Sequence, residues 1–330
     1  MRVQVARSKD ELSALVRSFR KFERQGRVGF DHGHLYLTFL VLLAFSALLW
    51  LVLWLELFGV RALDEGDTVV LALVNLAVLA LPLLGVSQKN NRLELLSEQI
   101  AEKWLWLDRG LEDKSHLIGD WWPRWRYTFG EFAQGDEDQH LTACLVARHR
   151  GSEHKFEYRY YGFEFTVVRQ ANFPDPVTKK MNTTEVRSVE KRYGIICDFP
   201  YAKSIAIVSG EGKFTYPATW KTASHSFNRR FRVRAGSEQE AARFLTPAVL
   251  LAIEEAAPAF TLMNLEINPL GQLCLSFSND LLEISRSSSL VHPARFELRL
   301  KQESGAPGLG AALHLIHTLM KYSDNNFERG

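Results

Sequence analysis

The chain has 330 residues, of which 46% are hydrophobic and 24% are charged, and its formal net charge is +2. These values are typical of a globular protein, and they argue against a disordered chain and against a dedicated nucleic-acid binder. Three scattered cysteines without a CxxC spacing fit a reducing compartment better than a disulfide framework.

Residues 1–34 are predicted to form a basic amphipathic helix. Ser8 and Glu11 make a capping-box pattern, which is a helix-start signal. The apolar residues that share one face are Leu12, Leu15, Val16, Phe19 and Phe22. The basic residues, which are candidates for binding anionic lipid headgroups, are Arg17, Arg20, Lys21, Arg24 and Arg27. Packing against a second cytoplasmic helix explains the pattern equally well.

Two long apolar runs predict a transmembrane helical hairpin. The first helix, residues 35–60, begins with LYLTFLVLLAFSALLWLVLWL, which has no charged residue and spans roughly 30 Å as a helix. An external acidic turn, residues 61–67, leads to the second helix, residues 68–88, which is also uncharged. A hairpin buried in a large soluble core is the alternative, but core helices are usually shorter and keep a polar stripe.

The distribution of basic residues predicts the orientation of this hairpin. Lysine and arginine are frequent in residues 17–27 and recur in residues 89–103, whereas the connecting turn has only Arg61. Because basic residues are retained on the cytoplasmic side, both termini are expected in the cytoplasm. The charged N-terminal segment does not fit a cleaved signal peptide. The acidic residues of the connecting turn are then expected on the outer side of the membrane.

Residues 89–118 are predicted to form a cytoplasmic stalk helix that ends before Gly119 and Pro123. The apolar residues within 93–111 that recur at nearly heptad spacing are Leu93, Leu96, Ile100, Trp104, Leu107 and Leu111. This seam could pair with residues 9–25 or with a second copy of the chain. It has fewer than four clean heptads, which leaves a coiled coil unproven.

Residues 119–330 are predicted to form a cytoplasmic α+β domain around an antiparallel sheet. Period-two patterns predict strands within HKFEYRYYGFEFTVV, SIAIVSGEGKFTY, FNRRFRVRAG and ARFELRL. Gly162 is expected to divide two strands, and Asn268–Gly271 to turn a hairpin. A capping box at Ser237 and Glu240 starts a helix that breaks or kinks at Pro247, and GLGAALHLIHTLMKY is a final helix.

The stretch SFNRRFRVRAGSEQEAARFLTPAVL resembles a bacterial membrane family. The residues that carry the resemblance are Phe227, Phe231, Val233, Ala241, Arg243 and the LTP of Leu245–Pro247. They are similar to the two-span family catalogued as domain of unknown function 3137. The resemblance implies a two-span N-terminal hairpin, a cytoplasmic body and a location in the bacterial inner (cytoplasmic) membrane. It supplies no activity and no catalytic residues.

No catalytic motif is recognisable, and neither a metal site nor a cofactor is expected. SGEGKF lacks the spacing of a phosphate-binding loop and lies between two strands. His314 and His317 share a helix without further zinc ligands, and the acidic GDEDQH lacks the calcium-loop pattern. Basic residues that alternate with aromatic ones in RRFRVR fit a phosphate or lipid contact, but solvent-facing strands give the same pattern.

A membrane-anchored, non-enzymatic interaction or regulatory protein is therefore the favoured function. Its expected partners are the bilayer and either a protein partner or a second copy of the chain, bound through residues 93–111. An anchored enzyme, with a site that one sequence does not reveal, is the alternative. A small channel has little support, because the apolar runs 35–55 and 69–86 contain no charged residue and a single side-chain amide, that of Asn75.

Overall fold

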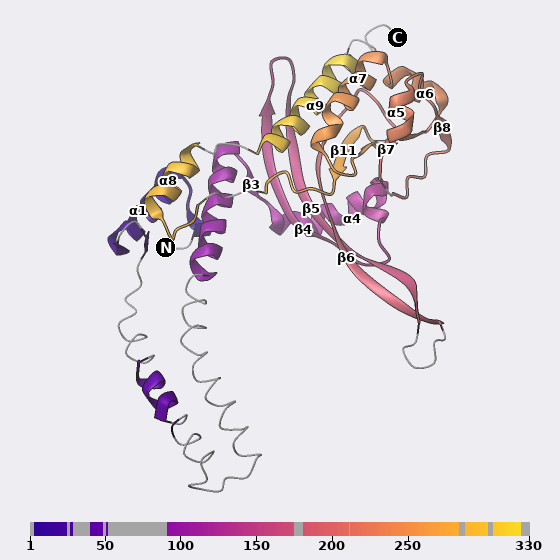
Figure 1. Ribbon diagram of the computed structural model, residues 1–330. Coiled ribbons are helices and arrows are strands. Elements are labelled where there is room, and N and C mark those ends of the chain that lie inside the picture. The colour runs from indigo at the N-terminus through magenta and orange to yellow at the C-terminus, as the bar shows by residue number, and fades with distance from the viewer. Residues whose placement is uncertain are drawn as a thin grey trace. The chain divides into compact units, whose positions relative to one another are not determined.

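The computed structural model describes residues 3–24, 27–28, 40–48, 51, 91–174, 181–210, 212–283, 288–302 and 306–324. These residues form an α+β structure around an antiparallel sheet, as the sequence predicts (Figure 1). The chain divides into two compact units. One contains Met1–Trp104 and Ile284–Ser304, and the other contains Leu105–Glu283 and Gly305–Gly330.

The predicted transmembrane hairpin falls mostly outside the described residues. Of residues 35–60, only 40–48 and 51 are described, and they are helical. The external turn, residues 61–67, and the second predicted span, residues 68–88, lie outside the described part of the chain. Within that described part, no helix has both the length and the apolar character needed to cross a bilayer.

The first unit is built around α1 (Lys9–Phe19) and α8 (Pro293–Gln302), which pack against each other. Ser8 accepts a hydrogen bond from the Glu11 amide at 3.2 Å, which confirms the predicted helix start. Leu12 and Val16 are buried, so α1 places its apolar face in the protein. The shorter elements are η1 (Val3–Val5), η2 (Arg20–Phe22), β1 (Glu23–Arg24) and β2 (Arg27–Val28), of which the two strands pair antiparallel.

The stalk helix is shorter than predicted. It covers residues 91–109 and ends at Gly110, whose φ of +64° lies in the left-handed region that glycine adopts readily. On its buried face, Ser97 Oγ donates to the Leu93 carbonyl and accepts the Leu290 amide at 2.8 Å. Leu93, Ile100 and Trp104 of the predicted seam are buried, so this part of it is covered by the same chain rather than left open for another copy.

The second unit contains a nine-stranded antiparallel sheet with the order β3-β4-β5-β6-β11-β10-β7-β9-β8. Its strands are β3 (Glu112–Asp113), β4 (Glu137–Arg150), β5 (Lys155–Pro174), β6 (Met181–Asp198), β7 (Ile205–Val208), β8 (Ala218–Trp220), β9 (Arg232–Ala235), β10 (Asn264–Ile267) and β11 (Gln272–Phe277). Its helices are η3 (Ser115–Leu117), α4 (Ile118–Thr128), η4 (Gly130–Ala133), α5 (His225–Arg230), α6 (Glu238–Phe244), α7 (Pro247–Ala256), η5 (Ala257–Ala259) and α9 (Pro307–Asp324).

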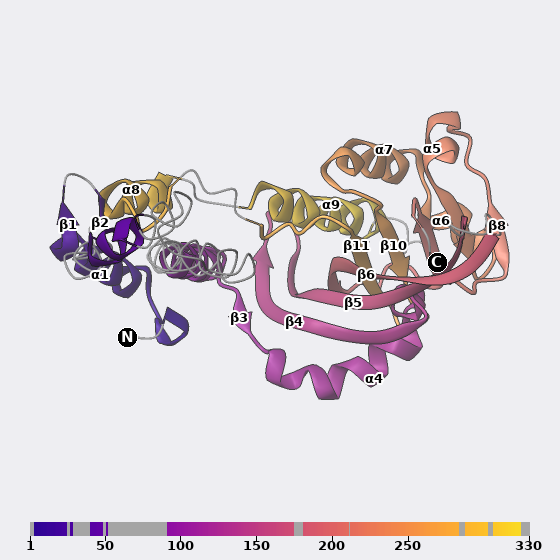
Figure 2. The ribbon, with the colours of Figure 1, turned by 60° about the horizontal axis from the view of Figure 1, so that its bottom comes forward.

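The sheet is strongly curved, with α4 on its convex face and α7 and α9 on its concave face (Figure 2). An aromatic core fills the space between α4 and the sheet, where Phe132 packs against Tyr161 and Phe163 with ring centroids 5.0 and 5.2 Å apart. β5 and β6 extend beyond their neighbours, because β4 pairs with β5 only as far as Thr166 and β11 pairs with β6 only from Tyr193. The outer halves of β5 and β6 therefore form a two-stranded ribbon.

Several local predictions are confirmed. Ser237 caps α6 by accepting the Glu240 amide at 3.2 Å, and the chain breaks before α7, which begins at Pro247. β10 and β11 form the predicted hairpin, whose turn is held by Asn268 Oδ1 accepting two backbone amides. The helix caps and the hairpin turn depend on residues only a few positions apart, so they can be predicted from the sequence alone.

Other local predictions are wrong. ARFELRL belongs to α8, because Phe296 and Leu300 are buried one helical turn apart and Pro293 suits a first helical position. Phe227 lies in α5 rather than in a strand, since Ser224 caps a helix there and β9 begins only at Arg232. No strand covers the described residues 212–217.

The structure also differs from the prediction at Gly162 and Pro123, where a strand boundary and a helix end were expected. Gly162 does not divide two strands, since β5 continues through it and pairs there with Tyr193 of β6. The side chain of Thr142 occupies the space that a Cβ at this glycine would fill. GDWWPRWR does not terminate a helix, because Pro123 lies inside α4.

One buried ion pair connects η4 to the centre of the sheet. Arg192 Nε donates to Glu131 Oε1 at 2.7 Å, and both side chains are at most 5% exposed. The remaining guanidinium donors reach Ser276, Ser278 and the carbonyl of Leu262. Asn264 Nδ2 also donates to Glu131, so this buried charge pair is fully embedded in hydrogen bonds.

We expect Arg192→Met to destabilise the second unit by about 3–5 kcal/mol, because it leaves the Glu131 carboxylate buried without its counter-ion. Guanidinium unfolding of the detergent-solubilised chain, followed by tryptophan fluorescence, measures the loss. Arg187→Met, at an exposed position of β6, is the matched control. Adding Glu131→Gln to Arg192→Met should recover part of the loss, whereas a strictly additive double variant contradicts the assignment.

Candidate functional site

The basic residues predicted to bind lipid headgroups lie in the first unit. Arg17 and Arg20 contact Glu297 of α8, with nitrogen–oxygen distances of 3.5 and 3.0 Å. Lys21 is exposed, and the side chains of Arg24 and Arg27 lie outside the described residues. The structure therefore joins Arg17 and Arg20 at one carboxylate and leaves their side chains about half exposed.

The two histidines noted on the final helix belong to a larger cluster. The ring of His317 in α9 lies 5.8 Å from that of His149 in β4 and 5.6 Å from that of His154. Burial lowers the pKa of His149, and the neighbouring His317 lowers it further. Even so, no group of three His, Cys, Asp or Glu residues in the described part of the chain is arranged to hold a metal ion.

The acidic stretch GDEDQH and the three cysteines, considered above as metal ligands or nucleophiles, have roles in the packing of the fold. Asp136 accepts the Val168 amide at 3.0 Å, so this residue of GDEDQH holds the edge of β5. All three cysteines are buried. Burial raises the pKa of the Cys144 thiol to about 12, and it raises those of Cys197 and Cys274 as well, so the reactive thiolate is disfavoured.

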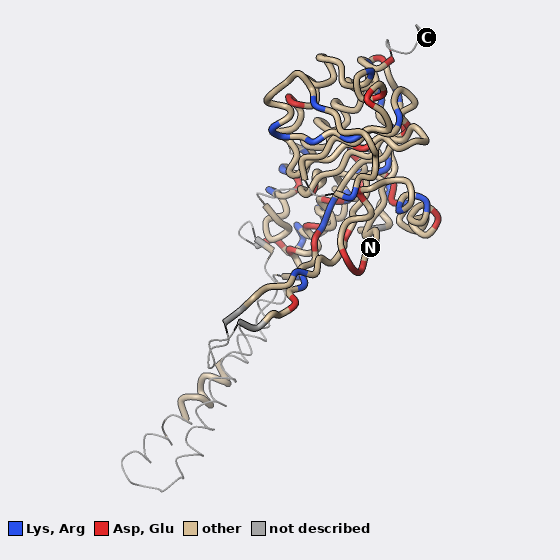
Figure 3. Tube along the Cα trace, turned by 90° about the vertical axis from the view of Figure 1, so that its right-hand side faces the viewer, with Lys and Arg blue, Asp and Glu red and all other residues tan. Residues whose placement is uncertain are grey.

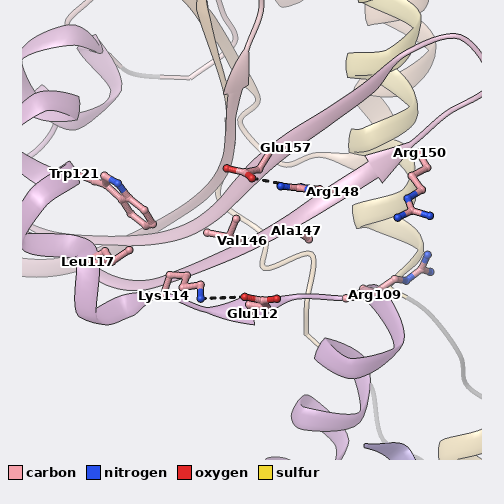
Figure 4. Close-up of a pocket in the computed structure, with 11 residues that line it drawn as sticks. Arg109, Glu112, Lys114, Leu117, Trp121, Val146, Ala147, Arg148, Arg150 and Glu157 are labelled. Carbon is pink, nitrogen blue, oxygen red and sulfur yellow. Dashed lines mark ion pairs between the residues drawn. The ribbon is translucent and has the colours of Figure 1, made fainter. Parts of the chain in front are cut away.

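A basic cavity of about 640 Å³ lies beside the outer edge of β4 in the second unit (Figure 4). We call it the β4-edge cavity. Its charged lining residues come from the end of the stalk helix, from β3 and the turn after it, and from β4 and β5. They are Arg109, Glu112, Lys114, Arg148, Arg150 and Glu157. The volume falls in the range of ordinary ligand sites.

The charges of the β4-edge cavity do not cancel. Lys114 pairs with Glu112 at 3.0 Å, and Arg148 pairs with Glu157 at 3.6 Å. Arg109 and Arg150 have no carboxylate partner within the lining, and their guanidinium groups point toward one another (Figure 4). The nearest carboxylate to Arg109 is that of its own neighbour Asp108, at 4.0 Å. Two guanidinium groups thus give the cavity an excess positive charge.

Apolar side chains form the rest of the lining. Leu117, Trp121 and Val146 contribute to it, and Ala147 completes it. The indole of Trp121 contacts the Arg159 guanidinium at 5.3 Å from the ring centroid and stacks with Trp125 at 5.7 Å. The wall is therefore held in place by neighbouring side chains, while the opposite end of the cavity carries the two arginines. Such a surface suits an anionic ligand with some apolar character.

The sequence did not reveal this site. The sequence predicts Arg109 in the middle of a longer stalk helix, and Arg148 and Arg150 are ordinary alternating residues of a strand. Only the turn at Gly110 brings the end of the helix next to β4. The available signal was the basic alternation of ARHR at residues 147–150, which is too short to be specific.

The carboxyl group of Glu266, near the centre of the sheet, has a raised pKa. Glu266 of β10 is buried and accepts a hydrogen bond from Tyr216 Oη at 3.0 Å. Burial raises the pKa of this carboxyl to about 7, although hydrogen bonds from the Gly130 backbone and from Tyr216 oppose the shift. Glu266 does not line the β4-edge cavity, and its raised pKa makes the stability of the fold depend on pH.

No protein-family model, curated protein or solved structure matches the chain. The functional argument therefore depends on the geometry and charge of the chain's own residues.

We expect Glu266→Gln to stabilise the protein at pH 8 and to change its stability little at pH 4.5. The folded-state pKa is raised, so stability declines as pH rises from about 4.5 to about 7 and then stays level. The gain at pH 8 is about 3 kcal/mol at most. Thermal unfolding across this range measures it, with the exposed Glu283→Gln as control. An equal gain at both ends of the range contradicts the pKa assignment.

Proposed function

We propose that the chain is a membrane-anchored, non-enzymatic interaction or regulatory protein of the bacterial inner membrane. In this proposal, residues 35–60 and 68–88 cross the bilayer, residues 61–67 face outward and both termini are cytoplasmic. The α+β body is then presented to a protein partner at the cytoplasmic surface. Membership in the two-span family catalogued as domain of unknown function 3137 is part of the same proposal.

The observation that carries the anchor is the surface of the described helical residues 40–48. Leu40, Val41, Leu43, Phe45 and Leu48 are 46–62% exposed. Neither a basic nor an acidic residue interrupts this stretch (Figure 3). Exposed apolar surface of this kind is costly in water, at about 25 cal/mol per Å², whereas lipid tails accommodate it. A bilayer is the environment in which such a helix is stable.

The basic N-terminal segment supports the same arrangement. The apolar face of α1 is buried in protein, which favours packing over immersion of this helix in lipid. Its basic side chains are still available at the surface, because Arg17 and Arg20 are about half exposed beside Glu297. We therefore assign the headgroup contacts to charge alone, through Arg17, Arg20, Lys21, Arg24 and Arg27.

We expect the double substitution Leu43→Arg and Phe45→Arg to shift the protein out of the membrane fraction. Each arginine near the centre of a span costs about 2.5–3.5 kcal/mol of insertion free energy. Val189→Arg, at an exposed position of the body, is the matched control and should stay in the membrane. The measurement is the share of protein that sediments with membranes and is released by detergent. Wild-type protein found in the detergent-free supernatant contradicts the anchor.

A reporter fused after Gly330 should be active only in the cytoplasm, because the basic residues flanking both runs hold these ends inside. A second fusion placed in the turn of residues 61–67 should give the opposite signal. The pair of fusions measures the orientation directly. A periplasmic signal from the C-terminal fusion would reverse the placement of the body.

A further inference from the structure

We propose that the β4-edge cavity binds an extended acidic segment of a partner protein, which adds to β4 as a strand. The inference deepens the proposed interaction function, on which it rests, by naming the chemistry of the partner. It depends on two separate properties of β4, which are the direction of its backbone groups and the charge of its side chains.

The backbone direction follows from Cys144. Its amide donates to Ser115 Oγ at 3.1 Å and its carbonyl accepts the Lys114 amide at 2.9 Å, so both groups point away from β5. Backbone groups alternate in direction along a strand. The register with β5 shifts only before Ala143, so the alternation continues without interruption to Arg150. The Gly151 amide agrees with it, since it points the other way, to the His154 carbonyl.

This alternation leaves a short open edge. Val146, Arg148 and Arg150 point their amides and carbonyls away from β5, and Val146 lies opposite Glu112 of β3. Because β3 has only two residues, none of the described strands lies opposite Arg148 or Arg150. Two amides and two carbonyls are thus available for another chain. Addition of a strand to such an edge is a common mode of peptide recognition.

The side chains define which peptide suits this edge. Arg148 and Arg150 project from the same face of β4, roughly 6.8 Å apart, which is the spacing of alternate residues in an added strand. Arg109 faces Arg150 from the end of the stalk helix (Figure 4). Carboxylates at alternate positions of the added strand therefore meet arginines, which bind them with charge-assisted hydrogen bonds. Apolar residues of the same strand have Leu117 and Val146 to contact.

The ordinary explanation of these features is an edge protected by charge. Natural sheets often place charged side chains on an edge to discourage pairing. Protection would account for Arg148, which shares the Glu157 carboxylate with Arg159, at 3.6 and 3.3 Å respectively. It does not account for a cavity at that edge or for a second arginine directed into it from another element. These two observations favour a binding site.

The test uses the full-length chain in non-ionic detergent and a short fluorescent peptide of alternating glutamate and valine. A peptide in which glutamine replaces every glutamate is the control. We expect the glutamate peptide to bind at least tenfold more tightly, with affinity that falls as salt is added. Arg109→Gln combined with Arg150→Gln should weaken it about tenfold or more, whereas the exposed Arg124→Gln should not change it.

A proline separates strand addition from charge attraction. The Arg148 amide points outward, where a proline is tolerated on an edge strand. Arg148→Pro and Arg148→Gln both remove the charge, but only the proline removes the amide donor. We expect the proline variant to bind the peptide at least several-fold more weakly than the glutamine variant. Circular dichroism establishes that both are folded, and the double arginine variant tests the site independently of this pair.

The outcomes are distinct. Equal binding of the two peptides, or unchanged binding by the double arginine variant, overturns the proposal. Equal affinity of the proline and glutamine variants overturns strand addition. If inorganic phosphate displaces the peptide at a concentration similar to that of the peptide itself, the cavity is a site for small anions, and the proposal of a peptide ligand is overturned. Peptide binding is measured without a bilayer, so a chain that does not bind the peptide does not contradict the proposed membrane anchor. In the same way, a chain that is not found in the membrane fraction does not contradict the peptide site.

Discussion

The interaction on which the second unit most depends is the buried pair between Arg192 and Glu131. It joins β6, η4 and the segment before β10 at a point where burial leaves no water to replace a lost partner. Leu262, whose carbonyl accepts from Arg192, has a φ of +48°, a conformation that costs free energy for a leucine. The network therefore holds a strained residue as well as two charges. It attaches η4 to the sheet, and α4, which contacts η4, carries the indole of Trp121 that lines the β4-edge cavity.

The cavity itself is a product of a short strand. β3 has two residues and begins just after the chain leaves the helix of residues 91–109 and turns at Gly110. A longer β3 would cover Arg148 and Arg150 and close the edge. The same turn brings Arg109 opposite Arg150. The short length of β3 thus accounts both for the open backbone groups of β4 and for the excess positive charge in the lining of the β4-edge cavity.

The elements that the sequence predicted well are those with local causes. Ser8, Ser237 and Pro247 act on residues in the same helical turn, so the sequence predicts the starts of α1, α6 and α7. The apolar residues of ARFELRL fit a period of two as well as a helical face, and the packing of α8 against α1 decides between the two.

The β4-edge cavity also depends on contacts between residues that are distant in the sequence. Arg109 and Arg150 become neighbours only after the sheet is folded, and neither belongs to a motif, so the sequence does not predict the cavity. The apolar runs remain predictions of the sequence, supported by the exposed residues 40–48.

The ribbon formed by the outer halves of β5 and β6 has one further consequence. Each of these segments has a single neighbour, whereas strands in the middle of the sheet have two, and an isolated pair of strands is only marginally stable in water. The ribbon is therefore stabilised mainly by its attachment to the rest of the sheet. Its amide protons should therefore exchange with solvent by local fraying, long before those of Ile195 or Ile196, which require the whole unit to open.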